Sequence, residues 1–374
     1  MQMFGARRFE FSIRELAGAV GDFGTLIPFT VGYILFCGFD PSGLLVGIGL
    51  TNIVLGLIYG LPLPVQPKKV IGTVALAQRW SRSKVLGAGF AVGLVWVVLS
   101  FSRRFGDLLG RVPRPVVRGI QLGLAFTLAL AAAEMMKPNP IYSLALTVIA
   151  FLLLRSRILP SSIFLVLFGL AYALATGSLH LGDISMSLSL PELQTFSLND
   201  LFYGFVYAGF AQLFLTLTNA VVATVALIRD LFPDRTDVTP RNLIANMGVM
   251  NILTPFIGGM PLCHGAGGLA AQYLFGARTG GAILMEGLIE MTLGLLFAGS
   301  LLAIFTSFPL FVVGVMLFLA SIELGKVSLK VEGNEEALVM LFTATVSTTF
   351  NIAVGFLSGL LLHAALEKGI IKGV

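Results

Sequence analysis

Two proline-marked interruptions break otherwise apolar stretches of this chain, and they recur at a fixed distance. The first covers residues 61–72 and the second covers residues 258–268, with Pro64 and Pro261 at matching places, 197 residues apart. Proline removes a backbone donor and disfavours helix in the residue before it. Each interruption therefore predicts an extended piece followed by a short apolar helix, and the repetition predicts a chain built from two related halves.

The amino-acid composition indicates whether the chain lies in water or in a membrane. Only 11% of the 374 residues are charged and 56% are hydrophobic, with a mean hydropathy of +0.93. A soluble globular protein carries about 25% charged residues. We therefore expect an integral membrane protein in a lipid bilayer. Continuous apolar runs, without the alternation of a barrel, predict an all-α protein.

The apolar runs predict about fourteen transmembrane segments, because a spanning helix needs about 20 residues. In the first half they lie at 13–37, 42–61, 65–79, 84–101, 114–135, 140–154 and 160–177. In the second half they lie at 200–228, 241–258, 262–276, 279–303, 308–324, 336–350 and 351–368. Because each half crosses the membrane an odd number of times, the second half begins on the opposite side from the first and has the opposite orientation. We therefore expect a 7+7 inverted repeat, with residues 1–187 as the first repeat and 188–374 as the second.

The basic residues gather on one side of this predicted topology. With the N-terminus inside, 18 of the Lys and Arg residues lie in cytoplasmic loops and 4 lie in outer loops. This bias follows the positive-inside rule. We expect a multi-pass protein of the cell membrane with cytoplasmic N- and C-termini. The first residues lack the pattern of a cleaved signal, and the net charge of +5 needs no nucleic-acid partner.

The third and tenth segments, 65–79 and 262–276, are too short to span as helices alone. About 12 helical residues cover roughly 18 Å, near half the hydrocarbon thickness. We expect each segment to cross half the membrane extended and half as a helix, so that two half-helices begin near the midplane and face one another. A helix start carries free N–H groups and a partial positive charge. Two opposed starts predict an anion site.

Polar side chains beside these helix starts are the candidate ligands. A lysine at membrane depth is a functional candidate by default, and of the adjacent Lys68 and Lys69 at most one would face the ligand. Gln66 and His264 offer hydrogen bonds, and His264 could also carry a proton. The plainer alternatives are lysines that snorkel to the membrane edge, a helix-to-helix hydrogen bond for Gln66 and simple packing for His264.

The offset of 197 residues also relates polar residues upstream of the interruptions. It maps Glu15 onto Gln212 and Asp22 onto Asn219. An aspartate would repel an anion, so we expect Asp22 to hold a lysine or backbone donors in place, with proton coupling as the alternative. Repeated polar positions beside paired interrupted segments are typical of the substrate site of a secondary transporter.

Several segments of the chain resemble the molybdate-transporter branch of the sulfate permease (SulP) superfamily. The segments are 15–25 (ELAGAVGDFGT), 64–69 (PVQPKK), 212–223 (QLFLTLTNAVVA), 260–270 (MPLCHGAGGLA) and 272–278 (QYLFGAR). The resemblance implies a uracil-permease-like fold, with a core domain of segments one to four and eight to eleven moving against a gate domain of segments five to seven and twelve to fourteen. The family pattern after Pro67 is Met-Lys, so Lys69 matches the family lysine and Lys68 departs from it.

From the residues and the resemblance together, we expect a secondary transporter of a tetrahedral oxyanion, molybdate first, with tungstate or sulfate as further substrates, moved by alternating access. The substrate-binding residues expected are Gln66, Lys69, Val70, His264, Gly265, Ala266, Gln212, Asn219 and Thr25, with Asp22, Glu15 and Lys68 as supporting or coupling residues. Proton coupling and a homodimer are further expectations.

Other functions stay as alternatives at this point. A sulfate or other inorganic-anion permease, an anion channel and a non-transporting membrane scaffold are compatible with the apolar sequence. A nucleobase permease fits less well, since such sites favour carboxylates over lysines. We expect no enzyme, cofactor or metal site, because the three histidines are scattered and no nucleophile lies at a recognisable spacing from a base.

Overall fold

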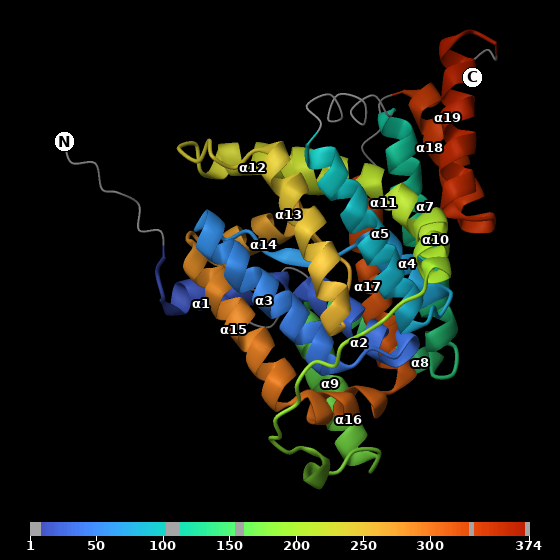
Figure 1. Ribbon diagram of the computed structural model, residues 1–374. Coiled ribbons are helices and arrows are strands. Elements are labelled where there is room, and N and C mark those ends of the chain that lie inside the picture. Colours follow the sequence, from blue (N-terminus) through green and yellow to red (C-terminus); the bar gives the residue numbers. More distant parts are fainter. Residues whose placement is uncertain (1–8, 102–112, 154–160, 329–332, 371–374) are drawn as a thin grey trace.

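The computed structural model describes residues 9–101, 113–153, 161–328 and 333–370, which form a helical bundle with a short two-stranded sheet (Figure 1). The first half contains α1 (Ile13–Ala19), α2 (Phe23–Cys37), α3 (Pro41–Tyr59), β1 (Val65–Pro67), α4 (Lys69–Ala77), α5 (Arg82–Ser100), α7 (Arg114–Met136), α8 (Pro140–Leu153) and α9 (Ser161–Ala175). The second half contains α10 (Leu198–Gly204), α11 (Phe210–Leu215), α12 (Ala223–Leu231), α13 (Pro240–Leu253), β2 (Leu262–His264), α14 (Ala266–Phe275), α15 (Gly280–Leu296), α16 (Ala298–Thr306), α17 (Leu310–Ser328), α18 (Asn334–Thr349) and α19 (Ile352–Glu367).

Three helices of the described chain, α3, α5 and α7, are each long and apolar enough to cross a membrane, and counting bent pairs as single spans raises the number to six. Large apolar side chains such as Val98, Leu152 and Leu361 are exposed on the outside of the bundle. Large apolar side chains exposed in this number indicate contact with lipid or another apolar partner. The helical class is as predicted, whereas the count of fourteen spans stays a prediction.

Three pairs of long helices join the two halves of the chain. α3 packs on α15, α5 packs on α13 and α7 packs on α17. Glycines make the first two contacts close: an added Cβ on Gly49 would lie 2.6 Å from the Gly287 carbonyl oxygen, and one on Gly248 would lie 2.7 Å from the Val97 nitrogen. Small residues at these places let the helix backbones approach one another, as in other membrane bundles.

α3 and α13 begin in the same way. Asp40 and Thr239 each accept a hydrogen bond at the helix start, and each is followed by a proline in the first helical turn. An oxygen-bearing cap followed by proline is a strong start signal for a helix. The two starts lie 199 residues apart in the sequence, close to the offset between the interruptions, so local signals position both helices alike.

The first helix of the second half contains two π-helical segments. They are Phe205–Gly209 and Thr216–Val222, and α11 lies between them. Each π-turn inserts an extra residue into the helix and shifts the faces that follow it; such turns occur frequently at functional sites. In the first half, α1 and α2 are joined by a 3₁₀ turn (Val20–Asp22), and α2 contains Pro28. The matching helices of the two halves are therefore both irregular.

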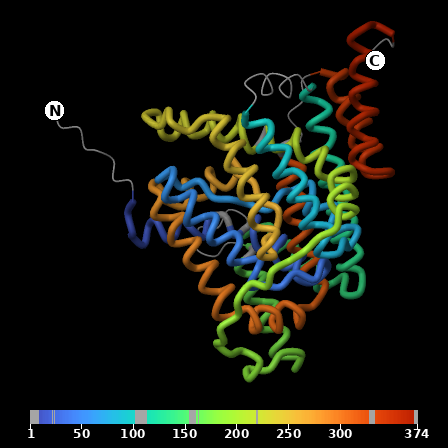
Figure 2. Tube along the Cα trace, viewed as in Figure 1, coloured from blue at the N-terminus to red at the C-terminus, as the bar shows by residue number. Residues whose placement is uncertain are grey.

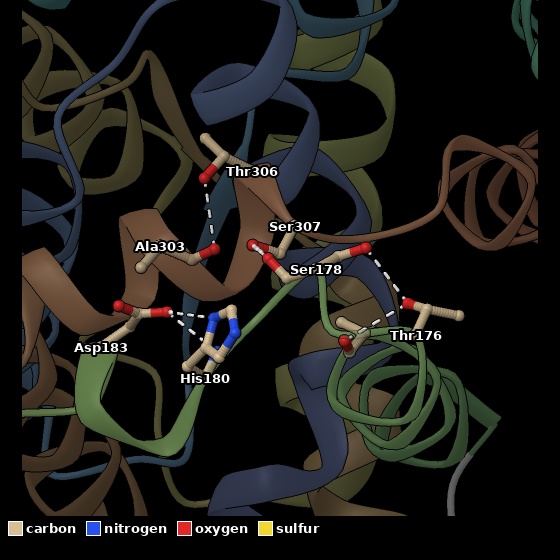
Figure 3. Close-up of polar contacts among 8 residues, drawn as sticks. Thr176, Ser178, His180, Asp183, Ala303, Thr306 and Ser307 are labelled. Atoms are coloured by element: carbon tan, nitrogen blue, oxygen red, sulfur yellow. Dashed lines mark hydrogen bonds and ion pairs between the residues drawn. The ribbon is translucent and has the colours of Figure 1, made fainter.

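The segment between the halves starts at the end of the bundle near α16, crosses the bundle to α10 (Figure 1) and is fixed to the second half. The Ser187 and Ser189 N–H groups donate to the carbonyls of Leu296 and Leu295 at the end of α15, at 3.0 and 2.7 Å. Figure 3 shows further contacts there: the Ser307 hydroxyl donates to the Ser178 carbonyl, 2.9 Å away. Carbonyls at a helix end lack partners within the helix, so this segment supplies them. α1 and α19 lie at opposite sides of the bundle (Figure 2).

Candidate functional site

The two proline-marked interruptions meet inside the protein. β1 and β2 pair antiparallel, with Val65 opposite His264, Gln66 opposite Cys263 and Pro67 opposite Leu262. The Lys68 N–H extends this ladder by donating to the Pro261 carbonyl at 2.8 Å. All six strand residues are buried. Segments 197 residues apart thus form one structure, and each strand leads directly into a short helix, α4 or α14.

Each strand is fixed to the helix that precedes it by a buried asparagine. Asn52 in α3 accepts the Val65 N–H at 3.0 Å and donates to Glu290 of α15 at 2.9 Å. Asn251 in α13 accepts the Leu262 N–H at 2.9 Å and donates to the Leu262 carbonyl at 2.6 Å. Buried backbone groups need hydrogen-bond partners, and the two asparagine amides supply partners for strand groups that the β1–β2 hydrogen bonds do not satisfy.

Lys68 brings a positive charge into this buried junction. Its side chain is 0% exposed, and its ammonium has no hydrogen-bond partner in the described part of the chain. It lies close enough to Cys263 and His264 to interact with both electrostatically. A buried charge without a partner is costly, so the ammonium indicates a site for an anion.

His264 is the second completely buried polar group at the junction. Its imidazole is 0% exposed, and among the described residues neither ring nitrogen makes a hydrogen bond of ordinary geometry. The Pro64 carbonyl nevertheless interacts with the ring, and the Tyr59 ring packs edge-on against it with centroids 6.2 Å apart. His264 therefore has hydrogen-bonding capacity that the chain leaves largely unused.

The start of α4 is occupied by a side chain from the other half. Gln212 of α11 accepts the Val70 N–H at 2.8 Å and the Ile71 N–H at 3.4 Å, and its amide nitrogen donates to Thr216 at 2.8 Å. We expected Val70 to offer this N–H to an anion, with Gln212 at the edge of the site. The structure places Gln212 where an anion at this helix start would bind.

The start of α14 is more open. Gly265 is its N-cap in an extended conformation, and no side chain caps the helix among the described residues. An added Cβ on Gly265 would collide with Oε1 of the buried Gln66, whereas one on Gly267 would meet nothing within 4 Å. Ala266 is half-buried. Free N–H groups at an uncapped helix start favour negative charge.

The helices α2 and α4 carry further buried polar atoms without partners in the described chain. Among them are the hydroxyls of Thr30 and Tyr33 on α2 and of Thr73 on α4. Tyr33 is 0% exposed and interacts electrostatically with Cys263. Unpartnered buried polar groups are uncommon in native proteins. The Tyr33 hydroxyl is therefore a further donor on the Cys263 side of the junction that the described chain leaves unused.

The other predicted residues have different surroundings. Lys69 is the first residue of α4 and is half-buried, so of the two lysines it is Lys68 that lies fully inside. Thr25 is half-buried in α2. Glu15 accepts the Arg278 and Thr279 N–H groups at the start of α15, at 2.9 and 3.1 Å. The side chains of Asp22 and Asn219 lie outside the described residues.

Sequence reasoning missed three residues of the junction: Tyr33, Asn52 and Asn251. The asparagines carried a usable signal, since each is an amide inside an apolar run and they lie 199 residues apart. Tyr33 carried none, because an aromatic residue in an apolar helix is ordinary core.

The family described as "Molybdate transporter of MFS superfamily" matches residues 14–128 and 204–324 of the chain. Molybdate transporter 1 of Arabidopsis thaliana is 31% identical over 96% of this chain and 89% of its own length. Molybdate transporter 1 of Chlamydomonas reinhardtii is 27% identical over 94% of this chain and 91% of its own length. The sequence similarity therefore extends over nearly the full length of this chain and of each relative.

Solved structures share the fold at low sequence identity. The transmembrane domain of a cyanobacterium bicarbonate transporter, BicA, aligns with a TM-score of 0.68 and 16% identity, over 94% of this chain and 96% of that domain. Murine Slc26a9, an anion transporter in the inward-facing state, aligns with a TM-score of 0.71 and 13% identity, over 99% of this chain and 70% of that one. The fold is that of these membrane transporters, which confirms the predicted helical membrane class.

Proposed function

The chain belongs to the molybdate transporter family, and from this we propose that it is a secondary transporter that carries molybdate across a membrane. It is a transporter and not an enzyme. Its fold is that of the SulP and SLC26 anion transporters. The observation that carries the proposal is the buried Lys68 ammonium at the β1–β2 junction, which lacks a partner in the described chain.

In this proposal the oxyanion binds at the junction and contacts both halves of the chain. Lys68 supplies the charge, and His264 and Gln66 supply hydrogen bonds. The uncapped start of α14 adds the N–H groups of Ala266 and its neighbours. At the start of α4, Gln212 must turn away from Val70 before that N–H can bind the oxyanion. Lys69, half-buried one residue later, serves the approach to the site rather than the site itself.

The packing of the helices supports a 7+7 inverted repeat. Exchanging each element for its counterpart in the other half turns the α3–α15 pair into the α13–α5 pair, and both pairs are present. The same exchange leaves the β1–β2 and α7–α17 pairs unchanged. We therefore propose fourteen segments, with α4 and α14 as the half-helices of the third and tenth, and repeats at 1–187 and 188–374.

The packing also supports a core domain and a gate domain. α7, α17, α18 and α19 pack together in one group. In the other, α3 packs on α15 and α5 on α13, and α3 and α13 also contact the strands. Contacts between the proposed core and gate include α4 on α7, α2 on α17 and α11 on α19. We propose alternating access by movement of the core (α1–α5 and α10–α16) against the gate (α7–α9 and α17–α19). A location in the cell membrane, cytoplasmic termini, a homodimer and proton coupling belong to the same proposal.

The decisive experiment is uptake of molybdate into liposomes that contain the purified protein. We expect saturable uptake that tungstate inhibits strongly and phosphate inhibits weakly, with sulfate between them. Stronger uptake of sulfate than of molybdate would assign the protein to general inorganic-anion transport. Flux that does not saturate would indicate a channel, and absence of both binding and flux would refute the proposal.

A further inference from the structure

We propose that residues 184–190, in the segment between the two halves, lie along one membrane surface with their apolar side chains in the lipid. The segment then anchors the connection between α9 and α10 at the boundary of lipid and water. The inference depends on the chain being a membrane protein and is independent of the substrate that it carries.

Apolar and polar side chains alternate strictly in this segment. The even positions hold Ile184, Met186, Leu188 and Leu190, and the odd positions hold Ser185, Ser187 and Ser189. Successive side chains of an extended chain point to opposite faces, so the apolar residues share one face and the serines share the other. No charged residue lies between positions 184 and 191. The sequence of the segment is therefore that of an amphipathic extended strand.

The backbone of the segment is extended and bonded to the bundle along one edge. The Ser185 N–H donates to the Ser300 hydroxyl of α16 at 3.0 Å, and that hydroxyl donates to the Ser185 carbonyl at 2.7 Å. The Ser187 and Ser189 N–H groups donate to carbonyls at the end of α15. Because these contacts recur at every second residue, the chain alternates here as a strand does.

The two side-chain faces of the segment stay largely uncovered by the part of the chain that the structure describes. Met186, Leu188 and Leu190 are between 68% and 71% exposed. Ser185 and Ser187 on the other face are exposed as well. Apolar side chains in water are unfavourable, whereas serine hydroxyls are readily hydrated. One face therefore needs an apolar partner and the other needs water, and the surface of a bilayer provides both.

The end of α15 places the segment at the depth of a membrane surface. Arg278 lies just before the start of this helix, and its 17 residues rise about 25 Å. The hydrocarbon core of a bilayer is about 30 Å thick. The charged side chains within the helix, Glu286 and Glu290, are buried in the bundle. The carbonyls of Leu295 and Leu296, which bind the segment, therefore lie near the membrane surface opposite Arg278.

The neighbouring helices present apolar side chains beside the segment. Leu288 is exposed, and it lies two turns before Leu295 on the same face of α15. Leu302 of α16, two residues after Ser300, is exposed as well. The apolar face of the segment thus extends a helix surface of the kind that contacts lipid. This continuity assigns lipid, and not a second copy of the chain, as the partner.

Spin labels at successive positions test the alternation. Met186→Cys, Ser187→Cys and Leu188→Cys are each labelled with a nitroxide and placed in phosphatidylcholine nanodiscs. Collision with oxygen, which concentrates in lipid, is compared with collision with a water-soluble nickel chelate. The ratio of the two should favour oxygen several-fold more strongly at positions 186 and 188 than at position 187.

Reference positions calibrate the two extremes of this ratio. Leu361→Cys, on the exposed face of α19, is the lipid reference, and Glu192→Cys, exposed in the same segment, is the water reference. The native Cys37 and Cys263 are buried, and wild-type protein treated with the label reports any background from them. Size-exclusion elution and melting temperature check that each variant is folded.

Each other outcome of the labelling overturns the inference. Preference for the nickel chelate at all three positions would place the segment in water. Shielding from both collision partners, with magnetic coupling between labels of two molecules, would show that a second copy covers the apolar face. A uniform preference for oxygen would show that the serines also lie in lipid.

Tryptophan fluorescence gives a second measurement without a label. Leu188→Trp should be quenched by phospholipids brominated near the headgroup, whereas Ser187→Trp should be quenched several-fold less. The native Trp80 and Trp96 are buried, so wild-type protein supplies a constant background. Equal quenching of the two variants would contradict the assignment of one face to lipid and the other to water.

Discussion

Asn52 and Asn251 make the same contact in the two halves of the protein. Asn52 accepts the N–H of Val65, and Asn251 accepts the N–H of Leu262, at 3.0 and 2.9 Å. Each asparagine sits in a helix packed against the other half and holds the strand that follows that helix. The register of the β1–β2 pair is therefore fixed from both sides, which places Lys68 and His264 at one junction.

Replacing either asparagine by leucine should destabilise the protein. Asn52→Leu and Asn251→Leu each leave a buried N–H without a partner, which costs about 1–3 kcal/mol. Asn52→Leu also removes the donor to the buried Glu290 carboxylate, so its effect should be the larger. The melting temperature of the purified protein measures this. Asn334→Leu, at the exposed start of α18, is the control and should have little effect. Core variants as stable as this control would show that the asparagines do not hold the strands.

The adjacent lysines should respond differently to substitution. Lys68→Met removes a charge-assisted hydrogen bond to the oxyanion, worth about 1.5–3 kcal/mol, or about one to two decades in molybdate affinity. The same change should leave the melting temperature of the empty protein unchanged or higher, because a buried charge without a partner is lost. Lys69→Met is the matched control, with a small effect on affinity. If Lys69→Met weakens binding more, the assignment of the two lysines is reversed.

The glycines at the start of α14 give a steric comparison. Gly265→Ala places a Cβ against Oε1 of Gln66, so Gln66 must move and molybdate affinity should fall by at least about tenfold, or about 1.4 kcal/mol. Gly265→Val should abolish uptake, because its branched side chain is larger and stiffer. Gly267→Ala has open space around the added atom and should bind nearly as wild type. Binding and melting temperature, measured on the same samples, separate loss of the site from loss of the fold.

A charge at Gln212 tests whether the start of α4 belongs to the site. Gln212→Glu keeps an oxygen that can accept the Val70 N–H, so the helix cap is retained. It also adds a negative charge near the bound oxyanion, and we expect molybdate affinity to fall by at least about tenfold. Gln194→Glu, in the segment between the halves, controls for the added charge. Unchanged affinity in Gln212→Glu would place the oxyanion away from α4.

The two interruptions were predictable from the sequence because their signals are local, whereas the pairing of their strands was not predicted. Pro64 and Pro261 mark where the helix must stop, and the polar stretch 177–200 marks the boundary between halves. The choice between Lys68 and Lys69 was not predictable in the same way. Lys68 precedes the helix with φ −65° and ψ 112°, so helical periodicity does not determine where its side chain points.

The partner of Gln212 could not be predicted either. Its contact with Val70 spans 142 residues of sequence, and it depends on how α11 is rotated between two π-helical segments. The offset of 197 residues relates Gln212 to Glu15, and both side chains accept N–H groups at the start of a helix. The two helices differ: Gln212 binds the start of α4, whereas Glu15 binds the start of α15.

The β1–β2 pair has a consequence for how such a chain could arise. A strand of three residues with no neighbour would leave its backbone groups exposed inside the bundle, and unpaired edges of this kind invite association with another chain. A half-length ancestor would thus have gained stability by joining a second copy of itself, which under the proposed inverted repeat is inserted in the opposite orientation. Fusing the two copies into one gene would preserve that pairing at a fixed one-to-one ratio. Separate fragments 1–187 and 188–374, produced together, are accordingly expected to reassemble, whereas neither alone completes the strand ladder.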